Sequence, residues 1–112
     1  MSSRAKLAPA SGGYRLLFDR DALEEWKTLD GSVKTPLRKL LAKRLQSPHV
    51  PGDALRGGLK NCYKIKLKAQ GYRLVYQVFD ERVVVLVIAV GKREREAVYE
   101  AALARLASLA RK

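Results

Sequence analysis

The sequence predicts an α+β fold, in which a small antiparallel sheet is packed by helices. Residues 62–77 alternate between apolar and polar or charged side chains, as a half-buried strand does, and Gln70-Gly71 interrupts the alternation. Residues 83–90 are apolar at every position, which is typical of a buried central strand. Stretches before and after these segments carry apolar residues at helical spacing. A chain of 112 residues fits one domain of this kind.

The first part of the chain predicts a tail, a strand and a helix. Residues 1–13 are rich in Ser, Ala, Pro and Gly without periodicity, so we expect a flexible tail before one domain over 14–112. Residues 14–18 are a strand candidate at or beside a sheet edge. Asp19 or Asp21 can cap the helix that follows, and Asp30-Gly31 ends it.

Ser32 is a candidate cap for a second helix, which is expected to form an antiparallel hairpin with the first and to end before Pro48. Its basic residues form either a solvated face or a docking surface for a nucleic-acid backbone: Lys34, Arg38, Lys39, Lys43 and Arg44.

The second part of the chain predicts a β-hairpin, a buried strand and a last helix. A two-residue loop at Gln70-Gly71 would place Lys64, Lys66, Lys68 and Arg73 on one face, with these pairs: Lys68 with Arg73, Lys66 with Val75, and Lys64 with Gln77. Like charges crowded on one face are destabilising, which indicates that a polyanion binds there. Gly91 ends the buried strand, and the predicted order is β-α-α-β-β-β-α, with a C-terminal helix.

The chain is strongly basic, with 23 Lys and Arg against 11 Asp and Glu and a formal net charge of +12. This balance favours nucleic acid, an anionic membrane surface or an acidic protein as partner. Cys62 is the only cysteine, which excludes an intramolecular disulfide and fits a reduced, cytoplasmic setting. No apolar run approaches the ~20 residues of a membrane span, so we expect no membrane partner.

Chemistry that depends on histidine pairs or on metals matches the sequence poorly. His49 is the only histidine and stands in a loop between prolines, where solvent exposure is usual. The carboxylates before position 30 are interpreted as helix-start residues rather than as a Mg²⁺ site. We therefore expect no metal and no cofactor, and an enzyme that works with Lys, Arg and Tyr.

Those residue types suit the cleavage of RNA by its own 2′-hydroxyl. When this hydroxyl attacks the adjacent phosphate, negative charge accumulates on a five-coordinate phosphorane, which fixed cations stabilise more than they stabilise the ground state. Cations near a tyrosine favour its phenolate, which can act as the general base. The basic hairpin is therefore a candidate phosphate site.

Two motif clusters closely resemble the RelE toxins of bacterial RelE/RelB toxin–antitoxin pairs. The first is Cys-Tyr-Lys-Ile-Lys-Leu at 62–67 with Gly-Tyr-Arg-Leu-Val-Tyr-Gln at 71–77, and the second is Val-Gly-Lys-Arg-Glu-Arg at 90–95 with Val-Tyr at 98–99. The likeness spans residues 14–106 and includes Leu-Glu-Glu-Trp at 23–26 and Leu-Arg-Gly at 55–57. It implies a RelE-like fold of the microbial-ribonuclease type.

The resemblance also implies an activity and its residues. The activity is that of a metal-independent, ribosome-dependent endoribonuclease that cuts the mRNA codon in the A site of the 70S ribosome and so inhibits translation. The implied catalytic residues are Lys64, Lys66, Arg73, Arg93 and Tyr99, and the expected RNA contacts are Arg56 and Lys68.

Each implied residue has an expected role. Tyr99 would be the base for the 2′-hydroxyl, and Arg93 would stabilise the phosphorane, with protonation of the leaving 5′-oxygen as a second role. Arg73 would clamp the phosphate, while Lys64 and Lys66 would stabilise charge and help to ionise the base. The products would be a 2′,3′-cyclic phosphate and a 5′-hydroxyl.

The resemblance further implies partners: a RelB-like antitoxin that displaces the last helix, the ribosome with its mRNA and rRNA, and operator DNA through the antitoxin complex alone. Two alternatives stay open at this point. The chain could be a non-catalytic member of the RelE/ParE superfamily that acts by binding a protein such as gyrase. It could also be a basic nucleic-acid-binding module without activity, in which Tyr99 packs on the sheet and Arg93 pairs with Glu96.

Overall fold

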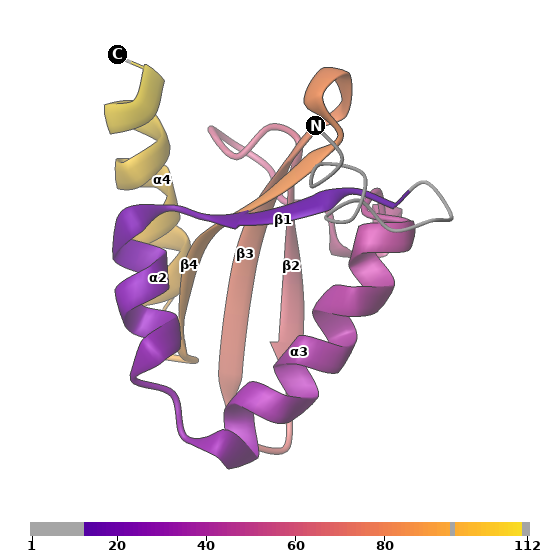
Figure 1. Ribbon diagram of the computed structural model, residues 1–112. Helices are drawn as coiled ribbons and strands as arrows, with labels where there is room; N and C mark the ends of the chain where they lie inside the picture. Colours follow the sequence, from indigo (N-terminus) through magenta and orange to yellow (C-terminus); the bar gives the residue numbers. More distant parts are fainter. Residues whose placement is uncertain (1–12, 95, 111–112) are drawn as a thin grey trace.

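The computed structural model describes residues 13–94 and 96–110. A strand β1 (Arg15–Phe18) leads into the helices α2 (Arg20–Lys27) and α3 (Gly31–Gln46). The strands β2 (Cys62–Leu67), β3 (Tyr72–Phe79) and β4 (Val84–Lys92) follow, and α4 (Ala97–Ala110) comes last (Figure 1). Two short 3₁₀ turns, η1 (Pro51–Asp53) and η2 (Asp80–Arg82), precede β2 and β4. The α+β class and the predicted element order are confirmed, while the predicted tail lies outside the described residues except for Gly13.

The sheet has the strand order β1-β4-β3-β2, so β4 is central, as predicted from its apolar run. The strands β2, β3 and β4 are antiparallel, but β1 pairs with β4 in parallel, from Arg15 opposite Val84 to Phe18 opposite Val87. The sheet is therefore mixed rather than wholly antiparallel. From the end of β1, α2 continues along the second half of β4, where the Val90 amide donates to the Glu25 carboxylate on α2.

The β2–β3 turn is longer than predicted. Leu67 pairs with Tyr72, which leaves a four-residue loop over 68–71, and the Gly71 amide donates to the Leu67 carbonyl oxygen at 2.9 Å. The register is thus shifted by two residues, and the observed pairs are Lys66 with Arg73 and Lys64 with Val75. A shift of two keeps every side chain on its predicted face, because side chains alternate with a period of two. Only Lys68 leaves the strand and joins the turn.

The helices cover both faces of the sheet. One core lies under α2 and α3 and contains Leu37, Leu41, Ile65, Leu74 and Tyr76. The other lies under α4 and is smaller; its buried residues are Leu59, Cys62, Val75, Ile88, Ala89, Val98 and Ala102. Because β4 contributes to both cores, its apolar character on two faces is explained. None of the described helices is long and apolar enough to cross a membrane.

Aspartates cap both amino-terminal helices. The Asp19 carboxylate accepts a hydrogen bond from the Asp21 amide, so Asp19 rather than Asp21 caps α2. Asp30 caps α3 by accepting from the Ser32 amide, so the prediction that Ser32 is the cap is wrong by two residues. Asp30 is favoured at the N-cap of α3 because its carboxylate reaches the free amides of the first turn, and because its negative charge suits the positive end of the helix dipole.

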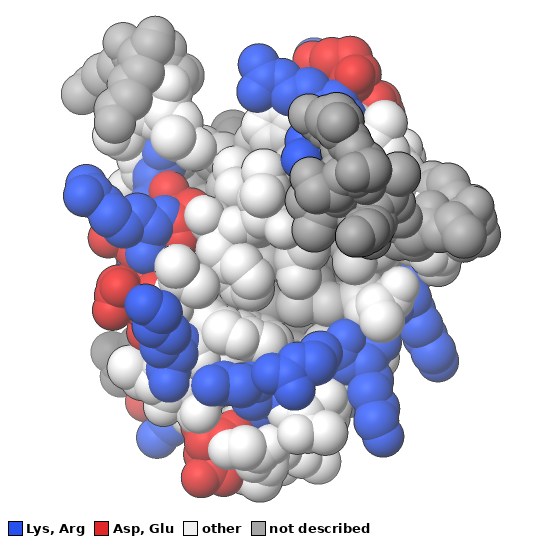
Figure 2. Space-filling model, in the orientation of Figure 1, with Lys and Arg blue, Asp and Glu red and all other residues white. Residues whose placement is uncertain are grey.

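The face that carries α2 and α3 has Lys and Arg side chains around a strip of uncharged surface between the two helices (Figure 2). Arg38, Lys39 and Lys43 are exposed on α3. Both predictions for these residues, a solvated face and a docking surface for a nucleic-acid backbone, require this exposure. Arg44 is different, because its guanidinium is 2.6 Å from Asp53 and donates to the Tyr76 hydroxyl at 2.9 Å. Arg44 therefore joins α3 to η1 and β3 and is not part of a free basic face.

Candidate active site

The lysines of β2 point to the side of the sheet that carries α4. Ile65 and Leu67 are buried under α2 and α3, and Lys64 and Lys66 alternate with them, so both lysines face the other way. Arg73 lies opposite Lys66 on β3 and shares this face. Three of the four predicted cations therefore gather on one side of the hairpin, in a different register, while the fourth, Lys68, lies in the turn.

A small pocket forms where the hairpin turn meets the end of β4. It is lined by Lys66, Leu67, Lys68, Gly71, Tyr72, Arg73 and Arg93. The Arg93 amide donates to the Gly71 carbonyl oxygen at 2.7 Å, which ties the segment after β4 to the turn. This backbone contact brings Arg93, distant from the hairpin in sequence, beside Lys66 and Arg73.

Tyr99 joins the same site from α4. The Arg73 Nη1 donates to the Tyr99 hydroxyl oxygen at 3.3 Å, and the guanidinium carbon lies 5.4 Å from the centre of the tyrosine ring. Arg73 is thus a cation in direct contact with the Tyr99 hydroxyl. The half-buried Tyr99 also packs against the smaller core, so it fulfils a structural role and presents its hydroxyl to the cations.

One hydrogen-bond donor of Arg73 has no partner. Its Nε is buried and is the only buried side-chain nitrogen or oxygen of the described residues without a hydrogen-bond partner. A buried donor without a partner carries a free-energy cost. Apart from this Nε, the Arg73 side chain lines the pocket, so its guanidinium is suited to hold a phosphate oxygen.

The other predicted residues lie at different distances from this pocket. Lys64 is half-buried and sits two residues before Lys66 on the same face. Lys68 lines the pocket from the turn. Arg56 is exposed in the loop between η1 and β2 and does not line the pocket. Arg95, part of the second motif, lies outside the described residues.

Acidic and histidine chemistry is absent from this pocket. No group of three or more His, Cys, Asp or Glu side chains among residues 13–94 and 96–110 could hold a metal ion. His49 lies instead beside η2, with its ring nitrogens 2.8 Å from the Tyr63 hydroxyl and 2.8 Å from the Asp80 carboxylate, which also accepts from the Tyr14 hydroxyl at 2.7 Å. Hydrogen bonds from His49 and Tyr14 hold the pKa of Asp80 below its usual value. His49 is exposed as predicted, but it links three segments of the fold.

One group of residues was not predicted at all. Glu25 on α2 and Arg105 on α4 form a close ion pair, 2.7 Å between Nη2 and Oε2, beside the end of β4. Glu25 is one of the carboxylates before position 30 that are interpreted from the sequence as helix-start residues, because it lies near the beginning of a predicted helix. The sequence contains only a weak indication of this pair. Positions 25 and 105 lie close to the core-facing sides of their helices, and position 105 follows the apolar position 102 by one helical turn.

The fold and the pocket define a class of protein. A family model described as the ParE toxin of type II toxin-antitoxin system, parDE, matches residues 16–97. The matched region contains β2, β3, β4, α2, α3 and the pocket, and all of β1 except its first residue. The class is therefore that of the toxins from type II toxin–antitoxin systems.

Individual relatives narrow this class. The chain is 54% identical over 93 residues to the mRNA interferase toxin RelE of Escherichia coli K12, covering 83% of this chain and 97% of the relative. The free E. coli RelE, solved as a mutant, superposes with a TM-score of 0.77 at 51% identity over 84% of this chain and 98% of that one. RelE in the intact E. coli RelBE toxin–antitoxin complex gives 0.70 at 55% identity, over 73% and 99%. The chain belongs to the RelE family of toxins.

Proposed function

We propose that this chain is the toxin of a toxin–antitoxin pair and that it cleaves mRNA on the ribosome. The observation that carries this proposal is the contact between Arg73 and the Tyr99 hydroxyl. It brings a candidate general base onto the face where the hairpin cations gather. Simple binding of a polyanion needs the cations but does not need a tyrosine hydroxyl among them. The E. coli relative is named an mRNA interferase, which agrees with this chemistry.

The pocket supports a division of roles. Tyr99 accepts the proton of the attacking 2′-hydroxyl, and Arg73, which lines the pocket beside it, holds an oxygen of the scissile phosphate with its guanidinium. Arg93 and Lys66 line the pocket from two sides and stabilise the charge that develops on the phosphorane. Arg93 also protonates the leaving 5′-oxygen. Lys64 adds positive potential from the same face.

Dependence on the ribosome follows from the chemistry of these groups. Lysine and arginine have pKa values far from 7, so the site lacks a well-tuned acid–base pair. Part of the barrier must then be overcome by holding the 2′-hydroxyl in line with the leaving oxygen. The A site of the ribosome, which orders three nucleotides of mRNA, supplies this alignment. Arg56 and Lys68 contact RNA outside the pocket, and the setting is cytoplasmic.

The cognate partner is an antitoxin of the RelB kind. E. coli RelE has been solved in its complex with RelB, and the similar fold and the net charge of +12 support the same arrangement for this chain. The antitoxin restrains the toxin by displacing α4, which carries Tyr99. Operator DNA is contacted through the antitoxin complex.

Cleavage mapping on programmed ribosomes tests the proposal. The wild-type protein is expected to cut in the A-site codon and to cut naked mRNA poorly. Tyr99→Phe and Arg93→Ala are each expected to lower the cleavage rate by at least ~10²-fold, as the loss of a transition-state group does. Wild-type cleavage by either folded variant would remove that residue from the site. Growth arrest without any mRNA cleavage would instead support the gyrase-type alternative.

A further inference from the structure

The end of β4 has a free edge that two side chains occupy. β1 accompanies β4 only as far as Val87, whose carbonyl oxygen accepts from the Asp19 amide at 2.9 Å. Beyond that point Arg105 Nη1 donates to the Ile88 carbonyl oxygen at 2.9 Å, and the Val90 amide donates to Glu25 Oε1 at 3.1 Å. The two side chains thus replace the missing strand.

These two side chains are also bound to each other. Arg105 Nη1 lies 2.9 Å from Glu25 Oε1 and Nη2 lies 2.7 Å from Oε2, so the pair is bidentate. The side chains are 18% and 35% exposed, and Asp21 lies 3.8 Å from Arg105 Nε. The hydrogen bond to Glu25 raises the pKa of Arg105. We call this arrangement of Glu25 and Arg105 with the Ile88 carbonyl and the Val90 amide the clasp.

The clasp connects α4 to the opposite side of the sheet. Glu25 belongs to α2, which covers one face, whereas Arg105 belongs to α4, which covers the other. Apart from this pair, α4 packs on the sheet through the buried Val98 and Ala102 and the partly buried Tyr99, Ala101 and Leu106. Leu103 and Leu109 are exposed, so not every large apolar side chain of α4 contributes to this packing, and the clasp adds a polar attachment.

We propose that the clasp positions Tyr99 and thereby sets the rate of cleavage; this inference rests on the proposed function. Tyr99 and Arg105 lie on the same helix, about 9 Å apart along its axis at 1.5 Å per residue. Fixing Arg105 at the edge of β4 therefore fixes the rotation and tilt of α4 at Tyr99. A displacement of about 1 Å at a reacting group can cost 10²-fold in rate. Glu25 and Arg105 line no part of the pocket, so they are positioning residues.

The kinetic test uses Arg105→Met, which keeps an apolar stem and removes the guanidinium. We expect the single-turnover cleavage rate on saturated programmed ribosomes to fall at least ~10-fold, with half-saturation unchanged within about 2-fold. In a Tyr99→Phe background the same substitution should cause no further fall, because the group it positions is gone. A merely structural role would lower the rate in both backgrounds.

The matched control is Glu24→Gln on α2, the helix that carries Glu25. Glu24 is 68% exposed and lies 3.8 Å from Lys27, away from α4, so its loss should leave cleavage unchanged. If Arg105→Met fails to fold, Arg105→Lys retains the charge with one contact and should give an intermediate rate. Wild-type rates in the folded Arg105 variant, or a full further loss in the Tyr99→Phe background, would overturn the proposal.

A second measurement separates the clasp from the proposed function. Glu25→Ala removes the acceptor of the Val90 amide, so the hydrogen exchange of this amide should quicken at least ~10-fold. Amides of β4 that point toward β3 should keep their protection. An unchanged exchange rate of the Val90 amide in Glu25→Ala would overturn the clasp, whether or not the protein cleaves mRNA. Absence of cleavage by the wild-type protein would overturn the proposed function, and the exchange result would still decide whether the clasp exists.

Discussion

Arg73 is the residue at which the two halves of the candidate site meet. Its Nη1 reaches the Tyr99 hydroxyl, its side chain lines the pocket, and its Nε is buried without a partner. A guanidinium can serve Tyr99 and a phosphate at once because its donors point in several fixed directions. A lysine ammonium on a flexible stem cannot do both in the same geometry.

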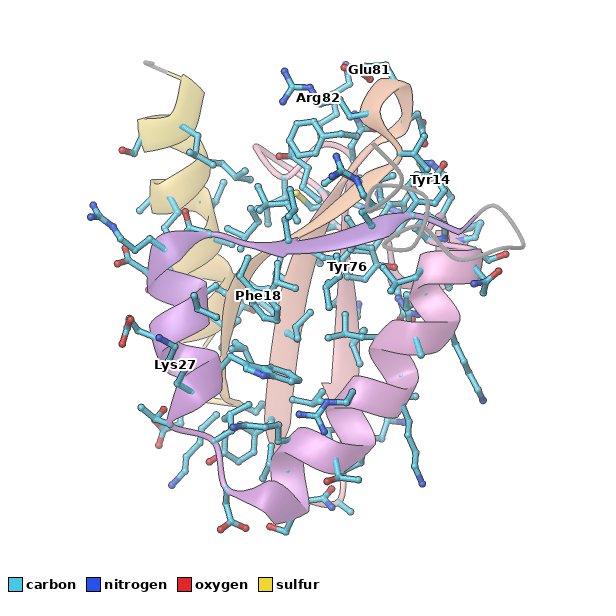
Figure 3. The ribbon with its side chains drawn as sticks, in the orientation of Figure 1. Tyr14, Phe18, Lys27, Tyr76, Glu81 and Arg82 are labelled. Carbon is cyan, nitrogen blue, oxygen red and sulfur yellow. The ribbon has the colours of Figure 1, made fainter. Side chains whose placement is uncertain are left out.

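We therefore predict that Arg73→Lys lowers cleavage on programmed ribosomes by about 10-fold to 100-fold although the charge is kept. The control is Arg82→Lys, since Arg82 lies on the η2 turn, at the other end of the sheet from the hairpin turn (Figure 3). Equal cleavage by the Arg73→Lys and wild-type proteins would show that only charge matters at this position.

Cys62 is a second residue whose behaviour follows from its surroundings. Burial raises the pKa of its thiol to about 12. A free thiol has a pKa of about 8.5, so folding raises the pKa of Cys62. The protonated thiol therefore adds to the free energy of unfolding in full below about pH 8.5. This added stability is lost as the pH rises from about 8.5 toward 12. We predict that the native thiol resists a disulfide reagent at pH 8 and reacts when urea unfolds the chain. Rapid stoichiometric modification of the native protein at pH 8 would contradict this prediction.

At the scale of elements, the β2–β3 turn depends on Gly71. Its φ of +71° is unfavourable for residues with a side chain, although an added Cβ would meet no atom within 4 Å. We predict that Gly71→Ala lowers the free energy of unfolding by about 1 kcal/mol, from backbone conformation alone. It should also reduce cleavage, because the Gly71 carbonyl holds the Arg93 amide.

The control for this prediction is Gly52→Ala in η1. An added Cβ there also meets no atom within 4 Å, and the φ of Gly52 is not in the left-handed region. Urea unfolding of both variants should therefore separate backbone strain from the mere addition of a methyl group. Equal free energies of unfolding for Gly71→Ala and Gly52→Ala would show that the positive φ of Gly71 does not determine the loss of stability.

The elements themselves could be predicted from local patterns, but not every pairing between them. Alternation at 62–67 and the apolar run in β4 identified the hairpin and the central strand because burial imposes these periods directly. The register of the hairpin depended on the turn, where the four residues 68–71 replace the two expected. The parallel pairing of β1 with β4 joins segments that are far apart in the chain, and no short-range pattern records such a pairing.

At the scale of the whole molecule, the site could be predicted in part. The hairpin cations were visible as a cluster in the sequence, whereas the roles of Arg93 and Tyr99 came from the likeness to RelE. The fold explains this difference, because the backbone contact from Arg93 to Gly71 and the contact from Arg73 to Tyr99 are both long-range. The clasp joins residues 80 positions apart, and isolated charged residues at such separation give no recognisable pattern.

The central claim is that the hairpin and α4 together catalyse attack by an RNA 2′-hydroxyl. The most direct test replaces the nucleotide 5′ to the mapped cleavage site by its 2′-deoxy analogue in an mRNA on programmed ribosomes. We predict that the all-ribose mRNA yields a 2′,3′-cyclic phosphate and a 5′-hydroxyl, and that cleavage of the substituted mRNA at that bond falls to background. Cleavage of the deoxy-substituted mRNA at the all-ribose rate would contradict the account.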